Sequence, residues 1–196
     1  MTEVAEIPLF PLHTVLFPGG PLSLRIFEPR YLDMVSRCMR DDCGFGVCLI
    51  REGTEIGPVK MATVGTLARI VDWEPRDDGM LGIVARGEGR FSIEESWRRK
   101  DGLHLGRLAS LPAEEAAPLP AEWRPMVAML RRLLAHFKSQ YQAVEPDFDD
   151  AGWVGCRFAE LLPLPLAQKQ VMLEMTNPLE RLRMLRPLVE SVKRRE

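Results

Sequence analysis

Short runs of alternating hydrophobic and polar residues recur over the first 110 residues of the chain. Residues 22–26, LSLRI, alternate strictly, so a strand here would present one apolar face. Residues 45–51, FGVCLIR, are apolar almost throughout, which indicates a strand buried on both faces. Further runs that predict strands, separated by connections rich in Gly and Asp, lie at 64–73, 81–87, 90–97 and 104–111. Short strands joined by tight turns predict a small, partly closed barrel.

One helix is expected between these strands. It should begin within the hexapeptide IFEPRY at 26–31. Pro29 fits the first position of a helix, where its missing N–H would be unpaired anyway. Glu28 precedes a proline and should stay extended, with its carboxylate accepting N–H groups of the first helical turn. Arg30 is close enough to pair with a neighbouring carboxylate. We interpret Glu28, Pro29, Arg30 and Tyr31 as a structural motif rather than a binding or catalytic site.

The hydrophobic period changes after residues 112–120, PAEEAAPLP, which read as a linker by composition. An apolar stripe at helical spacing then runs from Trp123 to Tyr141. This stripe predicts one helix of five or six turns.

Three shorter helices are predicted to follow. Asp149 or Asp150 can cap a helix over 151–162, another covers 166–175, and the last begins with Asn177 as its N-cap. Pro187 should kink or split this last helix. The pattern therefore predicts an α+β chain with a barrel over residues 1–111, a linker over 112–120 and a bundle of about four helices over 121–196.

Charge and composition narrow the classes of function. The 196 residues carry a net charge of −2, and neither half is the basic body that phosphate-dominated binding of nucleic acid requires. No apolar run approaches the roughly 20 residues that span a bilayer, and the N-terminus lacks the features of a signal peptide. We therefore expect a cytoplasmic protein with no membrane partner, whose four cysteines are reduced thiols.

No set of residues for catalysis can be assembled from the sequence. There is no Gly-Lys dipeptide, so a P-loop is absent, and the glycines of RGEGRF at 86–91 are expected to form a hairpin turn between two strands. The three histidines are scattered. Cys38, Cys43 and Cys48 are five residues apart rather than in tight zinc knuckles, which favours core thiols. We expect no enzymatic activity, no metal and no cofactor.

Several segments carry a family resemblance. Residues 7–35, IPLFPLHTVLFPGGPLSLRIFEPRYLDMV, resemble the opening of the N-terminal substrate-binding domain of the ATP-dependent Lon protease. Residues 64–70, VGTLARI, and 87–91, GEGRF, are similar to later landmarks of that domain, and residues 158–189 resemble its end. The resemblance implies a PUA-like pseudo-barrel followed by a helical bundle, and more distant similarity to the Lon-like domain of cereblon.

The resemblance also implies a role. In Lon this domain recognises and holds unfolded or damaged polypeptide and helps to assemble the ring. The chain ends where the ATPase module should begin, so it resembles a stand-alone Lon N-terminal domain protein, to which proteolysis and ATP hydrolysis do not carry over. Self-association is possible, and the sequence names no partner.

Two functions remain open at this point. The first is a non-catalytic module that binds unfolded or partner polypeptides, for which an exposed apolar groove is required. The Pro/Gly connection at 11–21 offers four candidate side chains for such a groove: Leu12, Val15, Leu16 and Phe17. The alternative is that these side chains plug the end of the barrel. The second function is RNA binding, which rests on analogy with other PUA-like folds and which the charge balance disfavours.

Overall fold

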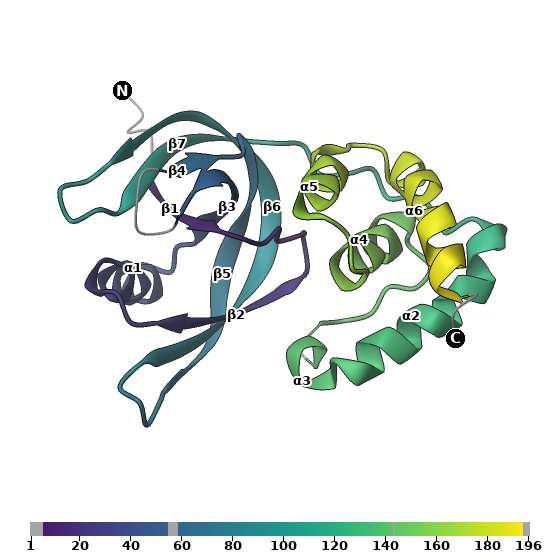
Figure 1. Cartoon of the computed structure of the whole chain (residues 1–196), viewed down its shortest axis with the longest axis horizontal. Coiled ribbons are helices and arrows are strands. Elements are labelled where there is room, and N and C mark those ends of the chain that lie inside the picture. Colours follow the sequence, from purple (N-terminus) through teal and green to yellow (C-terminus); the bar gives the residue numbers. More distant parts are fainter. Residues whose placement is uncertain (1–5, 55–58, 143, 194–196) are drawn as a thin grey trace. The chain divides into compact units, whose positions relative to one another are not determined.

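A computed structural model describes residues 6–54, 59–142 and 144–193 (Figure 1). The backbone divides into two compact units, Met1–Pro112 and Ala113–Glu196, which we call unit 1 and unit 2. None of the helices in the described ranges combines the length and the apolar character that crossing a membrane requires.

Unit 1 is a sheet that closes on itself and carries one helix. Strand β1 pairs in parallel with β3 and antiparallel with β7, and β7, β6, β5 and β3 pair in that order to complete the ring. Strand β2 pairs with β6, and β4 pairs with β3. The bounds are β1 Ile7–Leu12, β2 Pro21–Ile26, α1 Pro29–Arg40, β3 Phe45–Gly53, β4 Val59–Met61, β5 Val64–Pro75, β6 Leu81–Arg98 and β7 His104–Ser110. With the helices of unit 2, this ring confirms the predicted α+β class.

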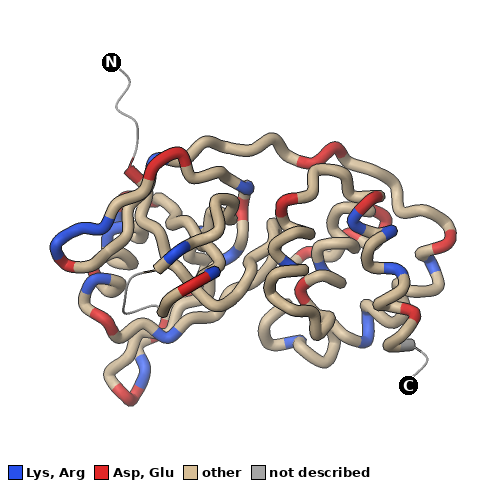
Figure 2. The backbone as a smooth tube through the Cα atoms, turned by 45° about the horizontal axis from the view of Figure 1, so that its top comes forward, with Lys and Arg blue, Asp and Glu red and all other residues tan. Residues whose placement is uncertain are grey.

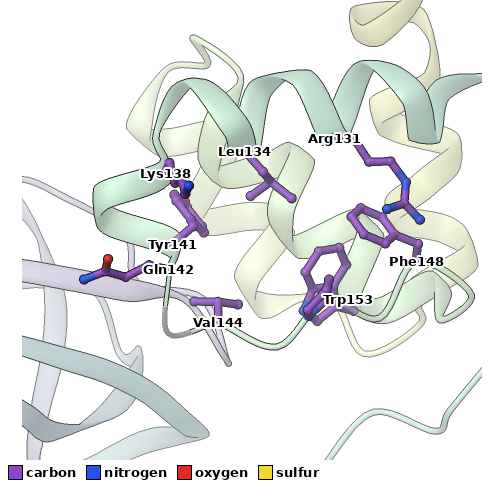
Figure 3. A pocket seen from close by; sticks show the side chains of 9 residues that line it. Arg131, Leu134, Lys138, Tyr141, Gln142, Val144, Phe148 and Trp153 are labelled. Atoms are coloured by element: carbon purple, nitrogen blue, oxygen red, sulfur yellow. The ribbon is translucent and has the colours of Figure 1, made fainter.

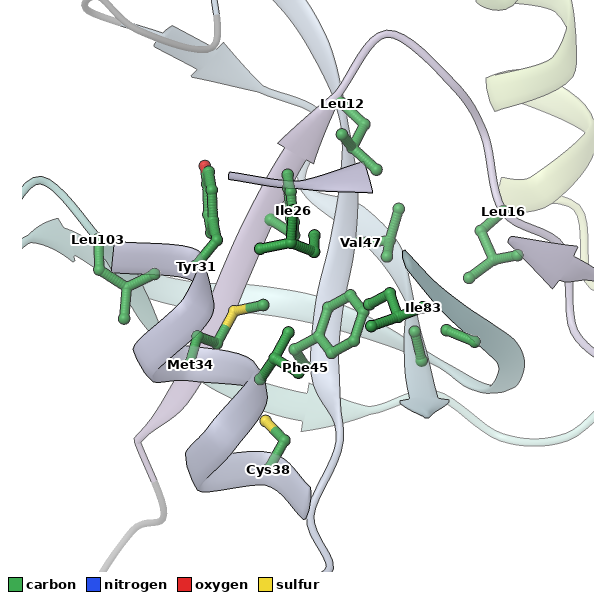
Figure 4. Packing of buried hydrophobic residues seen from close by; sticks show 14 of the residues in the cluster. Leu12, Leu16, Ile26, Tyr31, Met34, Cys38, Phe45, Val47, Ile83 and Leu103 are labelled. Atoms are coloured by element: carbon green, nitrogen blue, oxygen red, sulfur yellow. The ribbon is translucent and has the colours of Figure 1, made fainter. Parts of the chain in front are cut away.

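The core of unit 1 lies between the inner face of the pseudo-barrel and helix α1 (Figure 4). Helix α1 buries Tyr31, Met34 and Cys38, which share one face because of their helical spacing. Phe10 of β1 stacks on Tyr31, with the two ring centroids 3.9 Å apart. Strand β3 is buried throughout residues 45–50, as its continuous apolar run predicted.

The predicted hairpin turn at 86–91 is wrong, because strand β6 runs through these residues without a break. Gly87 instead permits a close approach of the loop that precedes β2. Its N–H donates to the carbonyl of Gly20, and its carbonyl accepts from the N–H of Gly19, both at 2.8 Å. A Cβ atom at Gly87 would lie only 2.4 Å from the carbonyl oxygen of Phe17. The glycine is therefore required by a neighbouring backbone and not by a turn.

We predict that Gly87→Ala lowers the free energy of unfolding by about 2–3 kcal/mol, because the added methyl group forces this loop away from β6. Gly89→Ala is the matched control, since a Cβ there meets no atom within 4 Å. The control should change stability by less than about 0.5 kcal/mol. Urea denaturation measures both, and equal effects of the two substitutions would contradict the close approach.

The described part of unit 2 is helical. Its elements are η1 Ala121–Trp123, α2 Arg124–His136, α3 Lys138–Tyr141, α4 Ala151–Leu161, α5 Leu166–Glu174 and α6 Pro178–Lys193. The single long helix predicted over 123–141 is wrong, because it begins with a 3₁₀ turn and is interrupted at Phe137, whose ψ of 30° lies outside the helical region. The apolar stripe shows only which side of the segment faces inward. It continues across the break at Phe137, so it does not reveal where one helix ends and the next begins.

Two predicted N-caps are confirmed. The Asp150 side chain accepts a hydrogen bond from the N–H of Trp153 at 2.7 Å and so caps α4. Asn177 accepts N–H groups from the first turn of α6 at 2.9 and 3.3 Å. Each cap satisfies N–H groups that have no partner within the helix.

The predicted split at Pro187 is wrong, since α6 continues through it. A proline inside a helix removes its own N–H from the ladder, and its ring crowds the carbonyl four residues earlier. Leu185 and Val189 are fully buried on either side of it, and their packing keeps the flanking turns helical.

Arg181 of α6 is fully buried and binds three segments of unit 2 together. Both terminal nitrogens of its guanidinium donate to the carboxylate of Glu114, which lies in the segment before η1. Its Nε donates to the carbonyl of Met172 at 2.9 Å, and one terminal nitrogen also reaches the carbonyl of Met175 at 3.1 Å. The segment that contains Glu114 is therefore packed into the unit, where Leu119 is also buried.

We predict that Glu114→Gln lowers the free energy of unfolding by about 3 kcal/mol, because it leaves the buried guanidinium of Arg181 without a countercharge. Glu190→Gln is the control: it breaks the exposed pair with Arg186 on the same helix and should cost less than about 1 kcal/mol. Both values come from chemical denaturation. Similar small losses would show that the buried pair does not hold unit 2 together.

Candidate functional site

The four candidate groove residues are buried, and Leu12 and Leu16 belong to the core of unit 1. Leu12, Val15, Leu16 and Phe17 are 7%, 8%, 4% and 0% exposed. The hydroxyl of Thr66 donates to the carbonyl of Leu16 at 2.6 Å, which fixes the loop from within the barrel. Leu12 and Leu16 pack as the plug alternative expects, and which of the two alternatives holds for the four residues together stays a prediction.

The hexapeptide at 26–31 makes a structural connection across unit 1. The guanidinium of Arg30 pairs with the carboxylate of Glu28 at 2.7 Å and donates to the carbonyl of Gly102 at 2.9 Å, in the turn between β6 and β7. Arg98 donates to the same carbonyl at 3.2 Å. Helix α1 begins at Pro29, as predicted. The expected capping by the Glu28 carboxylate is wrong, because that side chain makes no cap hydrogen bond and is directed to Arg30.

We predict that Glu28→Ala lowers the free energy of unfolding by about 1–3 kcal/mol, because Arg30 is almost completely buried and loses its carboxylate partner. Polypeptide binding, measured on the folded fraction, should stay unchanged. Glu52→Ala, which breaks an exposed pair with Lys60, is the control and should be nearly neutral. A larger effect on binding than on thermal stability would make the hexapeptide a site after all.

Unit 1 also carries exposed apolar side chains on strand β5. Val71 and Trp73 are each about half exposed, and the part of β5 that contains them pairs with β6 only. This strand edge offers few donors, because the N–H of Trp73 is bonded to the side chain of Asp72 at 2.9 Å and Pro75 has no N–H. Such an edge disfavours the addition of another strand.

A cavity of about 270 Å³ lies in unit 2, between helices α2, α3 and α4 and the loop before α4 (Figure 3). It is smaller than the roughly 300–1,000 Å³ of pockets for drug-sized ligands, so it suits one or two large side chains. Nine residues line it: Arg131, Leu134, Lys138, Tyr141, Gln142, Val144, Pro146, Phe148 and Trp153. Most of this lining is apolar or aromatic, and it includes no cysteine, histidine or carboxylate.

Helical spacing and ring contacts arrange the walls of this cavity. Leu134, Lys138 and Tyr141 face it at intervals of four and three residues, which places them on one side of α2 and α3. Phe148 meets Trp153 edge to face, with ring centroids 5.0 Å apart. Figure 3 shows the aromatic rings and Leu134 around the same hollow.

A buried polar network supports the floor. The carboxylate of Glu160 accepts from the hydroxyl of Tyr141 and from Nη2 of the fully buried Arg157, both at 3.0 Å, and it forms an ion pair with Nε of Arg157 at 2.9 Å. Its backbone carbonyl accepts from Lys169 at 2.6 Å. Burial, reinforced by the charge of Glu160, raises the pKa of Tyr141 above its usual value. Tyr141 therefore stays a neutral donor and its ring is fixed in the wall.

Three cysteines of the described ranges, Cys38, Cys48 and Cys156, are buried. Burial raises the pKa of Cys48 to about 12, and burial together with the nearby Cys43 does the same for Cys38. Thiols with such values are protonated near neutral pH and react poorly. Over the part of the chain that the structure describes, His, Cys, Asp and Glu form no group that could hold a metal ion.

Comparison with known proteins identifies the fold. Residues 6–191 match the family described as the ATP-dependent protease La (LON) substrate-binding domain. The chain belongs to this family. The resemblance inferred from residues 7–35 and 158–189 is thereby confirmed.

Two relatives show the extent of the Lon similarity. A crystal structure of a Lon N-terminal domain protein from Xanthomonas campestris is 38% identical, with a TM-score of 0.76, over 93% of this chain and 97% of that one. The Lon protease of Brevibacillus choshinensis is 27% identical over 200 residues, covering 95% of this chain and 25% of the relative. The chain thus spans about a quarter of the length of that protease.

Cereblon from Xenopus tropicalis is a more distant relative. It is 29% identical over 133 residues, which cover 66% of this chain and 29% of cereblon. The predicted similarity to cereblon is confirmed.

The cavity itself was not found from the sequence. Leu134 and Tyr141 belong to the apolar stripe that predicts a helix. From the sequence alone they cannot be told from ordinary core residues. Phe148 lies in a short acidic loop, and only the fold brings it against Trp153. The signal in the sequence that could have pointed to a surface role is an aromatic residue within an otherwise acidic loop.

Proposed function

We propose that the chain is a non-catalytic module that binds apolar segments of unfolded or partner polypeptides in the cavity of unit 2. The observation that carries the proposal is a concave, largely apolar and aromatic cavity in a member of a family described as substrate-binding. Apolar cavities with a few polar groups at their margins are the usual form of a binding site. The matched domain accounts for about a quarter of the Lon relative, so ATP hydrolysis and peptide cleavage are not assigned to these residues.

The size of the cavity sets the strength of binding. Complete burial of one Leu or Phe side chain contributes roughly 1.5–3 kcal/mol, whereas a dissociation constant of 1 mM already corresponds to about 4 kcal/mol. One anchored side chain therefore gives weak, rapidly reversible binding. An unfolded polypeptide presents many such side chains, so it rebinds easily, and a folded protein presents few.

We predict that Leu134→Gln weakens the binding of an unfolded polypeptide about five- to twentyfold, because it places an amide on the apolar wall. The probe is fluorescein-labelled, reduced and carboxymethylated lactalbumin, followed by fluorescence anisotropy. Met184→Ser and Trp73→Ser are controls, since both remove exposed apolar side chains outside the cavity.

Three results would count against this proposal. If the unmodified chain does not bind the probe, the function is wrong. If Trp73→Ser weakens binding and Leu134→Gln does not, the site lies on β5 instead. If unlabelled single-stranded RNA binds more tightly than the polypeptide and displaces it, RNA is the better ligand.

A further inference from the structure

The charged residues that line the cavity of unit 2 are of one sign. Arg131 and Lys138 line it, and no carboxylate does. We propose that the cavity selects apolar side chains that have carboxylates beside them in the polypeptide, so that the substrate class is acidic and apolar together. This inference rests on the proposed function and specifies its substrate.

The position of Arg131 suits a carboxylate at the mouth of the cavity. The central carbon of its guanidinium lies 3.7 Å from the centre of the Phe148 ring. A guanidinium stacked on an aromatic face keeps its N–H donors in its own plane, where they can bind a carboxylate with two parallel hydrogen bonds. An apolar side chain inside the cavity would place its neighbours in the sequence near these donors.

Both cations are available for a ligand. Neither Arg131 nor Lys138 forms an ion pair with a carboxylate of the described ranges. Other arginines form ion pairs within their own unit, such as Arg157 with Glu160 and Arg69 with two carboxylates. These two exposed cations beside an apolar cavity can therefore pair with carboxylates of a bound polypeptide.

Net charge alone does not produce this selectivity. Both signs of charge occur along the backbone of each unit (Figure 2), and the loop before α4 carries Glu145, Asp147 and Asp149, which do not line the cavity. These carboxylates weaken the attraction at a distance. Selection must come from direct contact with Arg131 and Lys138, so it is short-ranged and sensitive to salt.

Three labelled peptides test the inference by fluorescence anisotropy. Each has the same central Leu-Phe anchor and blocked ends, and the flanking residues are Glu, Ser or Lys. The Glu peptide should bind about three- to tenfold more tightly than the Ser peptide, and the Lys peptide more weakly than both. The difference should shrink in 1 M salt. A fourth peptide carries Ser and a free C-terminal carboxylate next to the anchor. Its affinity shows whether a terminal carboxylate has the same effect as the Glu side chains.

Substitutions assign the effect to the two cations. Arg131→Gln and Lys138→Gln should each weaken the Glu peptide about two- to fivefold and leave the Ser peptide within a factor of about two. Arg132→Gln removes a cation from the same helix, outside the cavity lining, and should change neither. Arg131→Gln also removes the packing of the guanidinium on Phe148. Lys138→Gln leaves that packing intact, so it tests the charge alone.

The outcomes separate the two proposals. If the three peptides bind equally, or the Lys peptide binds best, and Leu134→Gln still weakens all of them, charge selection is wrong and the polypeptide site stands. If the Glu preference persists in both cation variants, charge selection at this cavity is likewise wrong. If no peptide binds, the proposed function fails with it.

Discussion

A buried guanidinium is the constraint on which unit 2 depends. Arginine cannot lose its charge in a protein, so a fully buried Arg181 must have its donors satisfied and its charge balanced. Glu114 and the carbonyls at the end of α5 meet this demand. The side chain of Arg181 also passes within 3.3 Å of where a Cβ of Gly155 would stand, so it packs under α4. Helix α4, which carries Trp153, is thereby packed against α6. This packing also positions Trp153 in the cavity wall.

Unit 1 uses a similar device at its own corner. Arg30 lies next to the proline that starts α1, and its partner carbonyl belongs to Gly102, 72 residues further along the chain. The hexapeptide therefore fixes how the start of helix α1 meets the turn between β6 and β7. The charged pair within this hydrophobic hexapeptide is explained by burial and by hydrogen bonding, without any chemistry on a ligand.

The sequence predicted features whose causes are local, and it failed where the cause lies elsewhere in the chain. The caps at Asp150 and Asn177 were correct because a cap involves only neighbouring residues. The glycines at 86–91 were misread because the reason for Gly87 is the backbone of a loop that lies 70 residues earlier. The cavity required α2 and α4 to be brought together, which no periodicity in either helix encodes. The binding of acidic and apolar polypeptide segments by the cavity stays a prediction.

The strand edge of β5 limits how another chain could pair with the sheet of unit 1. An open edge with regular donors would let a captured polypeptide add as a further strand, and sheets that grow in this way seldom come apart. The bond between Asp72 and the N–H of Trp73, with Pro75 two residues on, removes donors from that edge. A polypeptide that met this part of β5 would therefore contact mainly its side chains, because few backbone donors are left there for strand pairing.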